Sequence, residues 1–409
     1  MRFLFVHQNF PGQFRHVARA LADNPQHEVV GIGDVKNIRP DSAALHPRIA
    51  VRAYPSPKRG GGQQTHPYLR ESEAHVRRGQ QLFRAAMQLK AQGFLPDVVV
   101  VHPGWGEGLF LKELFPAARH VHYCEYFYRA DGGDVGFDPA FPGSLDERLK
   151  VHVRNSTQLL GLTQCDAGVA PTPWQRSRYP VEYQSKISVL HEGIDTALVT
   201  PNAQAALEVQ GKVFRAGDEI VTFVARNLEP YRGFHCFMRA LPKLQALRPS
   251  AQFIIVGGEE VSYGRRLPAG ETYRKKYSAE IQEQVDWSRI HFLGKLPYLD
   301  YLKVLQVSAA HVYLTYPFVL SWSMLEAMAA GCLVIGSATP PVQDVITDGE
   351  NGVLTDFFDT EMLAQKVADA LANPQAFASI RQRARECIQQ RYDLHTHCIP
   401  AWLAFLTQH

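Results

Sequence analysis

Two arginines, Arg226 and Arg232, lie on either side of a short loop that directly follows an apolar run ending at Ala225. A guanidinium group carries five N–H donors in a planar fork, and this geometry matches the oxygens of a phosphate group. The pair therefore indicates a site for a diphosphate. The alternative is two solvated surface arginines.

A second group of polar residues lies where a helix is expected to begin, near Ser321 or Ser323. The first turn of a helix leaves backbone N–H groups unpaired and carries a partial positive charge, so Ser321, Trp322 and Ser323 could hold a diphosphate. Glu326 lies one turn further on, where its carboxylate could accept hydrogen bonds from ribose hydroxyls. Ser323 and Glu326 also have the spacing of a capping box, in which they would only satisfy the end of the helix.

The loop that follows the first apolar run contains Pro11 and Gly12 but no GxGxxG pattern. We therefore expect no dinucleotide cofactor. Gly12 lets the backbone approach a ligand closely, whereas an ordinary turn between a strand and a helix is the alternative. In the same half of the chain, His102 and Trp105 follow another expected strand. They could shape a ligand pocket or serve only in packing.

Short apolar runs alternate with amphipathic stretches along the chain. The strands and helices that these runs predict would position the candidate residues. The expected strands are Phe3–Val6, His27–Ile32, Val98–Val101, His120–Tyr123, Glu219–Ala225, Gln252–Gly257, Ile290–Leu293, His311–Leu314 and Leu333–Gly336. Helical patterns separate them, so we expect an α/β fold in which parallel sheets are covered by helices on both faces. A polar, turn-rich segment at 201–217 divides two such series. We expect domains at 1–200 and 201–385, and a C-terminal helix at 386–409 that packs back on the first domain.

Composition excludes several classes of protein. A chain of 409 residues is too long for one core, and its 45% hydrophobic and 20% charged residues exclude a disordered chain. A net charge of +3 gives no case for nucleic acid as a partner. The six cysteines form no CxxC pair and are expected to be reduced and buried, which suits the cytoplasm. The apolar run at the start ends at His7, too early for a signal peptide or a membrane span.

In combination, these motifs resemble the family 4 retaining glycosyltransferases, which have the GT-B fold of two facing Rossmann-like domains. The most specific match is the run Leu325–Ala329 with Gly331, followed by a strand and the turn Asp348–Gly352. Two further stretches look like family motifs near the domain boundary, namely Pro171–Trp174 and Glu192–Asp195.

The resemblance implies roles for single residues of the second half. Arg226 matches a family arginine at a strand end, Arg232 replaces a lysine before glycine, and both would stabilise charge on a departing diphosphate. Glu326 matches the second glutamate of a Glu-x7-Glu motif and would hold the ribose. Phe318 stands at the first glutamate position, so the usual acidic contact to the donor sugar is absent there. Leu296 would lie against the nucleobase.

In the first half, Gly12 is expected to contact the donor, and His102 and Trp105 could shape the acceptor pocket because aromatic faces suit sugars. Glu125 is the nearest match to a family histidine that contacts the donor sugar. It could orient the acceptor hydroxyl, accept its proton, or stabilise positive charge on the sugar. A buried, paired structural carboxylate is the alternative.

The expected activity is retaining transfer of a sugar from a UDP- or GDP-sugar to a glycan or lipid-linked acceptor, in the synthesis of a surface polysaccharide or lipopolysaccharide. No metal and no other cofactor is expected. A GT-B nucleotide-sugar epimerase and a nucleotide-sugar-binding protein without transfer activity are the alternatives. Basic residues from Lys58 to Arg84 could rest on anionic lipid at the inner face of the cytoplasmic membrane, or form a solvated helix face.

Overall fold

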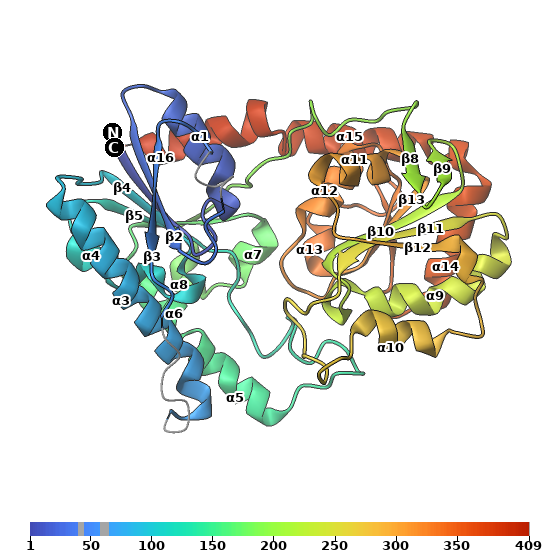
Figure 1. The fold of residues 1–409 in the computed structure, drawn as a ribbon, viewed down its shortest axis with the longest axis horizontal. Coiled ribbons are helices and arrows are strands. Elements are labelled where there is room, and N and C mark those ends of the chain that lie inside the picture. Colours follow the sequence, from blue (N-terminus) through green and yellow to red (C-terminus); the bar gives the residue numbers. More distant parts are fainter. Residues whose placement is uncertain (40–44, 58–64, 409) are drawn as a thin grey trace. The chain divides into compact units, whose positions relative to one another are not determined.

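The computed structural model describes residues 1–39, 45–57 and 65–408. The chain divides into two compact units (Figure 1). The first comprises Met1–Gly193 together with His395–His409, and the second comprises Ile194–Leu394. From the sequence we expected the chain to change domain at residues 200 and 386. In the structure, residues 194–200 and 386–394 belong to the second unit instead.

A parallel sheet of seven strands forms the centre of the first unit, in the order β3-β2-β1-β4-β5-β6-β7. The strands are β1 (Arg2–Val6), β2 (Glu28–Asp34), β3 (Ile49–Tyr54), β4 (Val98–Val101), β5 (Arg119–Tyr123), β6 (Ala167–Ala170) and β7 (Ile187–Val189). β4 is the run Val-Val-Val-Val and is buried throughout, as expected of a parallel strand covered on both faces. The strand order reverses between β1 and β4, because β2 and β3 lie on the other side of β1.

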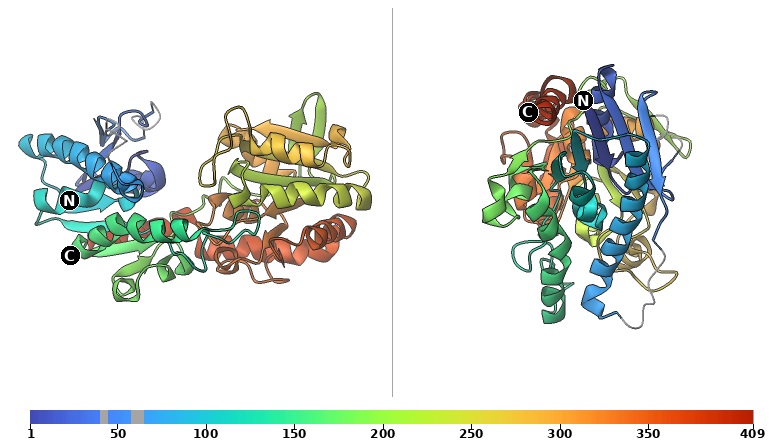
Figure 2. Two further views of the ribbon diagram at one scale, coloured as in Figure 1. Left: turned by 90° about the horizontal axis from the view of Figure 1, so that it is seen from below. Right: turned by 90° about the vertical axis from the view of Figure 1, so that its left-hand side faces the viewer.

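The C-terminal helix belongs to this first unit. The helices of the first unit are α1 (Arg15–Asp23), α3 (Arg70–Ala91), α4 (Leu111–Leu114), α5 (Leu145–Arg154), α6 (Ser156–Gln164), α7 (Pro173–Ser177), α8 (Val181–Gln184) and α16 (Ile399–Thr407). Helix α16 packs against α1 (Figures 1 and 2). Trp402 and Leu406 are buried in the same cluster as Phe3 of β1. The Trp402 indole N–H donates to the carbonyl of His191 at 3.0 Å. The last residues therefore complete the core of the unit in which the chain begins.

The second unit repeats the same topology with six parallel strands, in the order β12-β11-β10-β13-β14-β15. The strands are β10 (Ile220–Asn227), β11 (Gln252–Gly258), β12 (Ile290–Gly294), β13 (Ala310–Tyr313), β14 (Val334–Ser337) and β15 (Val353–Thr355). The order reverses between β10 and β13. Both units thus have the strand order of a Rossmann-like domain.

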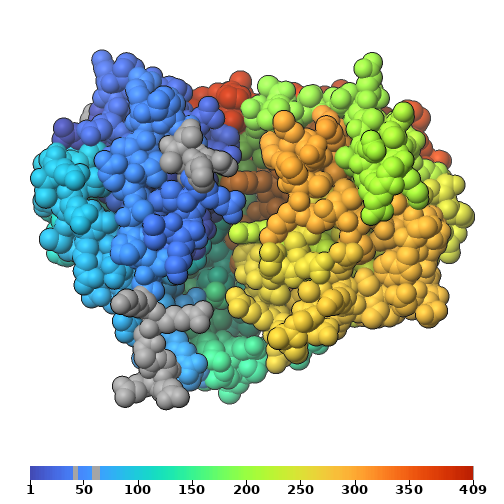
Figure 3. Space-filling view, in the orientation of Figure 1, coloured from blue at the N-terminus to red at the C-terminus, as the bar shows by residue number. Residues whose placement is uncertain are grey.

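A hairpin precedes this sheet. The sequence predicted a turn-rich boundary at 201–217, and this prediction is wrong, because the segment contains the antiparallel strands β8 (Ala206–Val209) and β9 (Lys212–Arg215). Leu207 and Phe214 are buried against Ile220 and Ile254 of the sheet. The hairpin forms part of the surface shown in light green in Figure 3.

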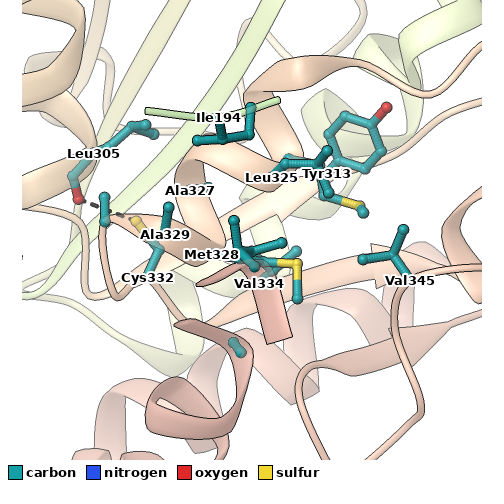
Figure 4. Close-up of a cluster of buried hydrophobic side chains, with 14 of the residues drawn as sticks. Ile194, Leu305, Tyr313, Leu325, Ala327, Met328, Ala329, Cys332, Val334 and Val345 are labelled. Atoms are coloured by element: carbon teal, nitrogen blue, oxygen red, sulfur yellow. Dashed lines mark hydrogen bonds between the residues drawn. The ribbon is translucent and has the colours of Figure 1, made fainter. Parts of the chain in front are cut away.

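The helices of the second unit are α9 (Phe234–Leu247), α10 (Tyr273–Glu280), α11 (Tyr298–Gln306), α12 (Trp322–Ala329), α13 (Pro340–Gln343), α14 (Thr360–Ala372) and α15 (Ala378–Arg391). Helix α12 is mostly core: its residues Met324, Leu325, Ala327 and Met328 are fully buried. Figure 4 shows Leu325, Ala327 and Met328 within this cluster. Just beyond α12, the Cys332 thiol donates to the carbonyl of Leu305 at 3.1 Å. The apolar faces of α12 therefore fix its place beside β13 and β14.

The two ends of the second unit are hydrogen-bonded to each other. The Ile194 N–H donates to the Tyr392 carbonyl at 2.8 Å, and the Leu394 N–H donates to the Ile194 carbonyl at 2.9 Å. The Thr196 hydroxyl also donates to the Asp393 carboxylate at 2.5 Å. The chain therefore enters and leaves this unit at one place.

In the described ranges, no helix combines the length and the apolar character that crossing a membrane requires. All six cysteines are free thiols. Five are buried, whereas Cys387 is partly exposed and differs in this from the expectation.

Candidate functional site

Several candidate residues of each unit lie at that unit's own topological switch point. In open parallel sheets, ligands bind beyond the carboxyl ends of the strands, where the strand order reverses. In the first unit, the loops after β1 and β4 begin at His7 and His102. In the second unit, the loops after β10 and β13 contain Arg232 and Ser321. The topology thus brings these residues to the edge where each unit is expected to bind its ligand.

Arg232 is held firmly beneath the loop that follows β13. Its side chain donates from Nη1 to the Thr315 hydroxyl at 2.9 Å, to the Val319 carbonyl at 2.8 Å and to the Tyr313 hydroxyl at 3.4 Å. The residue is only 7% exposed. The next residue, Gly233, has φ +69, and a Cβ there would lie 2.2 Å from Cβ of Leu314. Only glycine therefore lets the turn bring Arg232 to this place.

Arg226 differs from Arg232 in its surroundings. It is the last residue but one of β10, and its side chain is exposed. Its charge contributes to a lowered pKa of the Glu260 carboxyl, for which the first cause is a hydrogen bond from Lys295. The Lys295 ammonium lies 2.7 Å from that carboxylate. Arg226 therefore belongs to a small charged group with Glu260 and Lys295, which the sequence reasoning did not assign to the site.

The start of α12 is capped by Ser321. Its hydroxyl accepts from the Ser323 N–H at 3.4 Å and lies 2.9 Å from the Ser323 hydroxyl. The Ser321 N–H donates to the hydroxyl of Tyr313 at 2.8 Å, the same hydroxyl that Arg232 approaches. Trp322, the first residue of the helix, is exposed. The helix start and Arg232 are thus joined through one tyrosine.

Glu326 does not form the capping box that its spacing allowed. The cap is Ser321, and the two oxygens of the Glu326 carboxylate accept from Tyr298 at 2.7 Å and from Tyr301 at 2.8 Å. Burial raises the pKa of this carboxyl, while the two hydrogen bonds act in the opposite direction. Leu296, two residues before Tyr298, is partly buried against the core of the unit. Glu326 is therefore a carboxylate that tyrosines of α11 orient.

The first-unit loop after β1 is shaped by Gly12 and His7. Gly12 has φ +48, and a Cβ there would lie 2.6 Å from Cε1 and Nε2 of His7. The Nδ1 atom of His7 accepts from the N–H of Asn9 at 2.9 Å, which assigns the proton to Nε2. Burial and the nearby His102 lower the pKa of His7 to about 3. His7 is therefore a neutral ring packed under Gly12.

Glu125 follows β5 and has partners from two other loops. Its carboxylate accepts from Gln13 Nε2 at 2.6 Å and pairs with His102 Nε2 at 3.1 Å. Burial acts to raise the pKa of Glu125, but the contacts with His102, Gln13 and His7 outweigh it and lower the pKa below its ordinary value. The side chain is 27% exposed. Glu125 is therefore an ionised, paired carboxylate that still reaches the surface.

His102 connects Glu125 to an aromatic group. Its Nδ1 accepts from the N–H of Gly104 at 3.2 Å, so Nε2 carries the proton that is donated to Glu125. Trp105 stacks on the His102 ring with centroids 4.3 Å apart, and the His7 ring lies 5.1 Å from Trp105. Five residues from three separate loops, His7, Gln13, His102, Trp105 and Glu125, thus form one group of side chains in the first unit. Gln13 and His7 are members that the sequence reasoning missed.

Among the residues that the structure describes, no group of three or more histidine, cysteine, aspartate or glutamate side chains is arranged to hold a metal ion.

Two Rossmann-like units in one chain define the GT-B fold, and the family comparison agrees with it. Residues 25–199 match the model described as glycosyl transferase family 4 group, and residues 207–387 match the model described as glycosyl transferases group 1. The chain belongs to the family 4 glycosyltransferases.

The match to each named relative covers only part of that relative's length. A phosphatidyl-myo-inositol mannosyltransferase of Mycolicibacterium smegmatis is 31% identical over 180 residues, which are 42% of this chain and 41% of that protein. A D-inositol 3-phosphate glycosyltransferase of Corynebacterium efficiens is 27% identical over 210 residues, which are 49% and 46% of the two chains. The chain thus spans less than half the length of these two relatives.

Solved structures show the same fold over the whole chain. HepE of Anabaena in complex with UDP has a TM-score of 0.70 at 16% identity, and the match covers 100% of both chains. The sucrose-phosphate synthase of Thermosynechococcus elongatus has a TM-score of 0.74 at 18% identity and covers 99% of this chain and 98% of that one. At these identities the likeness concerns the fold alone.

Proposed function

We propose that this protein is a retaining glycosyltransferase that moves a sugar from a UDP- or GDP-sugar to an acceptor. The observation that carries the proposal is the group at the switch point of the second unit, where Arg232 and the start of α12 share the Tyr313 hydroxyl. Positive charge and the backbone N–H groups of a helix start suit a diphosphate. Glu326, held by two tyrosines one turn into α12, suits the ribose hydroxyls, and Leu296 contacts the base.

Two comparisons support the choice of donor. Solved structures of HepE contain UDP or UDP-glucose, and one relative of Mycolicibacterium smegmatis is named a GDP-mannose-dependent mannosyltransferase. The donor of this chain is accordingly proposed to be a UDP- or GDP-sugar.

Transfer with retention breaks the bond between the sugar C1 and the diphosphate oxygen, and forms a bond from C1 to the acceptor oxygen on the same face. The acceptor proton passes to an oxygen of the departing diphosphate, so no separate protein base is needed. Arg226 and Arg232 stabilise the charge that develops on the diphosphate, which is the task a metal ion performs in other transferases. The proposed reaction therefore requires no metal.

In the first unit, Glu125 is the proposed partner of the acceptor. Its pKa lies below the ordinary value, so at neutral pH it accepts hydrogen bonds and does not donate them. It can orient an acceptor hydroxyl through one oxygen lone pair while Gln13 and His102 hold the carboxylate in place. Trp105, stacked on His102, provides a flat face beside it. Gly12 is proposed to contact the donor through its backbone.

The acceptor is proposed to be a glycan or lipid-linked sugar of a surface polysaccharide or lipopolysaccharide, used at the inner face of the cytoplasmic membrane. In the described part of the first unit, Leu145 and Leu149 of α5 are exposed beside Arg148 and Lys150, which pair with Asp131 and Asp146. Apolar and basic side chains together suit an anionic lipid surface. The basic stretch Lys58–Gly62 expected to share this role lies outside the described residues.

Incubation of the protein with UDP- and GDP-sugars, with and without lipid extracts, tests the proposal. Slow hydrolysis of the donor and release of nucleoside diphosphate are the expected results. The His102–Glu125 pair supplies a carboxylate and a histidine, so an epimerase is the second candidate, and inversion at C2 of the sugar would identify it. Saturable binding with no turnover would identify a nucleotide-sugar-binding protein instead.

A further inference from the structure

A buried glutamate of the second unit holds one segment of a long loop. Glu229 follows β10 and is 1% exposed. Its carboxylate accepts from three consecutive backbone N–H groups, those of Ser262 at 3.2 Å, Tyr263 at 3.1 Å and Gly264 at 3.0 Å. A buried carboxylate is costly unless it is hydrogen-bonded, and here the loop supplies those bonds. Glu229 therefore fixes the backbone of this segment, which lies between β11 and α10.

The segment is fixed to the same loop that carries Arg232. Besides Glu229, the side chain of Asn227 contacts the Ser262 hydroxyl at 2.7 Å. Asn227 and Glu229 both lie between Arg226 and Arg232 in the chain. One loop, residues 226–232, thus contains both the arginines proposed for the diphosphate and the residues that hold the segment with Tyr263.

Tyr263 is placed beside Arg232 and Phe318 by this attachment. Its ring centroid lies 4.9 Å from that of Phe318 and 6.2 Å from that of Tyr231, and the Arg232 guanidinium carbon lies 5.6 Å from it. Tyr263 is 40% exposed, whereas Phe318 is buried. We call Tyr231, Tyr263 and Phe318 the aromatic wall.

The aromatic wall has the chemistry of a surface for a sugar ring. The run Tyr316–Leu320, which contributes Phe318, has no charged side chain. A pyranose presents a face of C–H groups that packs on an aromatic ring, while its diphosphate needs the positive charge that Arg232 supplies next to the wall. Aromatic side chains with a few placed polar groups are typical of small-molecule sites.

We propose that Tyr263 determines the affinity for the sugar part of the donor, by packing its ring against the C–H face of a pyranose, and that Glu229 is its positioning residue. This inference rests on the proposed function and adds the means by which the same site recognises its sugar. The ribose of the nucleotide is proposed to be held by Glu326, whose carboxylate is oriented by Tyr298 and Tyr301. Changes at Tyr263 should therefore affect the sugar nucleotide but not the nucleotide alone.

The test is a titration of the full chain with UDP and UDP-glucose, and with GDP and GDP-mannose, by calorimetry. For Tyr263→Ala we expect the Kd of the bound sugar nucleotide to rise about tenfold, equivalent to about 1.4 kcal/mol. The Kd of the matching nucleoside diphosphate should change less than about twofold, a difference of about 0.4 kcal/mol. Tyr263→Phe keeps the ring and should restore the affinity. Trp287→Ala, another aromatic truncation in the second unit, is the control.

Glu229→Gln tests the positioning role, because an amide accepts fewer hydrogen bonds from the three N–H groups. It should raise the KM for the sugar nucleotide in the same direction as Tyr263→Ala, whereas Glu219→Gln at the start of the sheet should not. Equal loss of affinity for the diphosphate and the sugar nucleotide in Tyr263→Ala would overturn the inference and leave the proposed function standing. Failure of the unaltered protein to bind any of the four ligands would overturn both.

Discussion

The carboxylate of Glu326 accepts a hydrogen bond from the hydroxyl of Tyr301 at 2.8 Å. The bond leaves the carboxylate with further lone pairs and fixes its direction, as a ribose-binding group requires. For Glu326→Gln we expect the Kd of the nucleoside diphosphate to rise about tenfold, because a charge-assisted hydrogen bond is lost. Calorimetry measures this change, and Glu350→Gln in an exposed turn is the control. A fall in melting temperature with unchanged affinity would contradict the ribose role.

The two arginines should respond differently to truncation. Arg226 is exposed, so Arg226→Ala should lower kcat about 100-fold while the free energy of unfolding changes by less than about 0.5 kcal/mol. Arg232→Ala should also cost about 1–3 kcal/mol of stability, because it leaves the Val319 carbonyl and the Thr315 hydroxyl without this donor. Turnover assays and urea unfolding measure the two effects. Arg239→Ala, which breaks an exposed ion pair with Glu280, is the control.

Gly233 should tolerate no side chain. Gly233→Ala places a methyl group 2.2 Å from Cβ of Leu314 at φ +69, so we expect a loss of about 3 kcal/mol or more. Gly211 has φ +80 with nothing within 4 Å of a Cβ, so Gly211→Ala should cost only about 1 kcal/mol of backbone strain. Thermal unfolding compares the two variants. Equal losses would mean that contact with Leu314 is unimportant.

Glu125 should matter for turnover rather than for donor binding. Glu125→Gln removes the negative charge, and we expect kcat to fall about 100-fold with the Kd of the donor nucleotide unchanged. Since the pKa of Glu125 lies below its ordinary value of 4.5, its ionisation should not limit kcat/KM at any pH above that value. Rate measurements from pH 5 to 8 check this expectation. An acid limb near neutral pH that disappears in Glu125→Gln would contradict it.

Buried histidines should make the protein sensitive to acid. Burial lowers the pKa of His7, His122 and His311 from 6.5 to about 3. The unfolded chain therefore binds protons that the folded chain does not, and the stability present above pH 6.5 is lost as the pH falls towards 3. Each of the three histidines should lower the free energy of unfolding by about 1.4 kcal/mol as the pH falls from 7.5 to 5.5. Unfolding in urea at the two pH values measures the loss, and His122→Gln should reduce it.

The main strands of both sheets could be predicted because a parallel strand covered on both faces leaves an unbroken apolar run, as in Val98–Val101. The hairpin β8–β9 could not be predicted, since only alternate residues such as Leu207 and Val209 are buried among polar neighbours. The strands β3, β6, β7 and β15 were also not predicted. β7, for example, has three residues, of which only Ile187 is buried. Short or half-exposed strands therefore leave a hydrophobic pattern too weak to be recognised in the sequence.

Residues next to an element boundary, such as Arg226 and Glu326, could be placed on their elements from the sequence. Their partners could not. Gln13 lies 112 residues before Glu125, and Tyr298 lies 28 residues before Glu326, so only the folded chain brings each pair together. Glu229 also escaped attention, because a carboxylate that bonds backbone N–H groups needs no particular partner residue in the sequence.

In topological terms, the second unit is an insert within the first, because the first unit consists of residues before Ile194 and after Leu394. Hydrogen bonds join Ile194 to Tyr392 and Leu394, so the two ends of the insert are neighbours. An insert whose ends are neighbours can be cut out of the chain as one continuous piece. Residues 194–394 should therefore be a natural fragment for expression by themselves, whereas the first unit can only be recovered by splicing Gly193 to His395. A simple deletion of the C-terminus would instead remove Trp402 from the core where the chain begins.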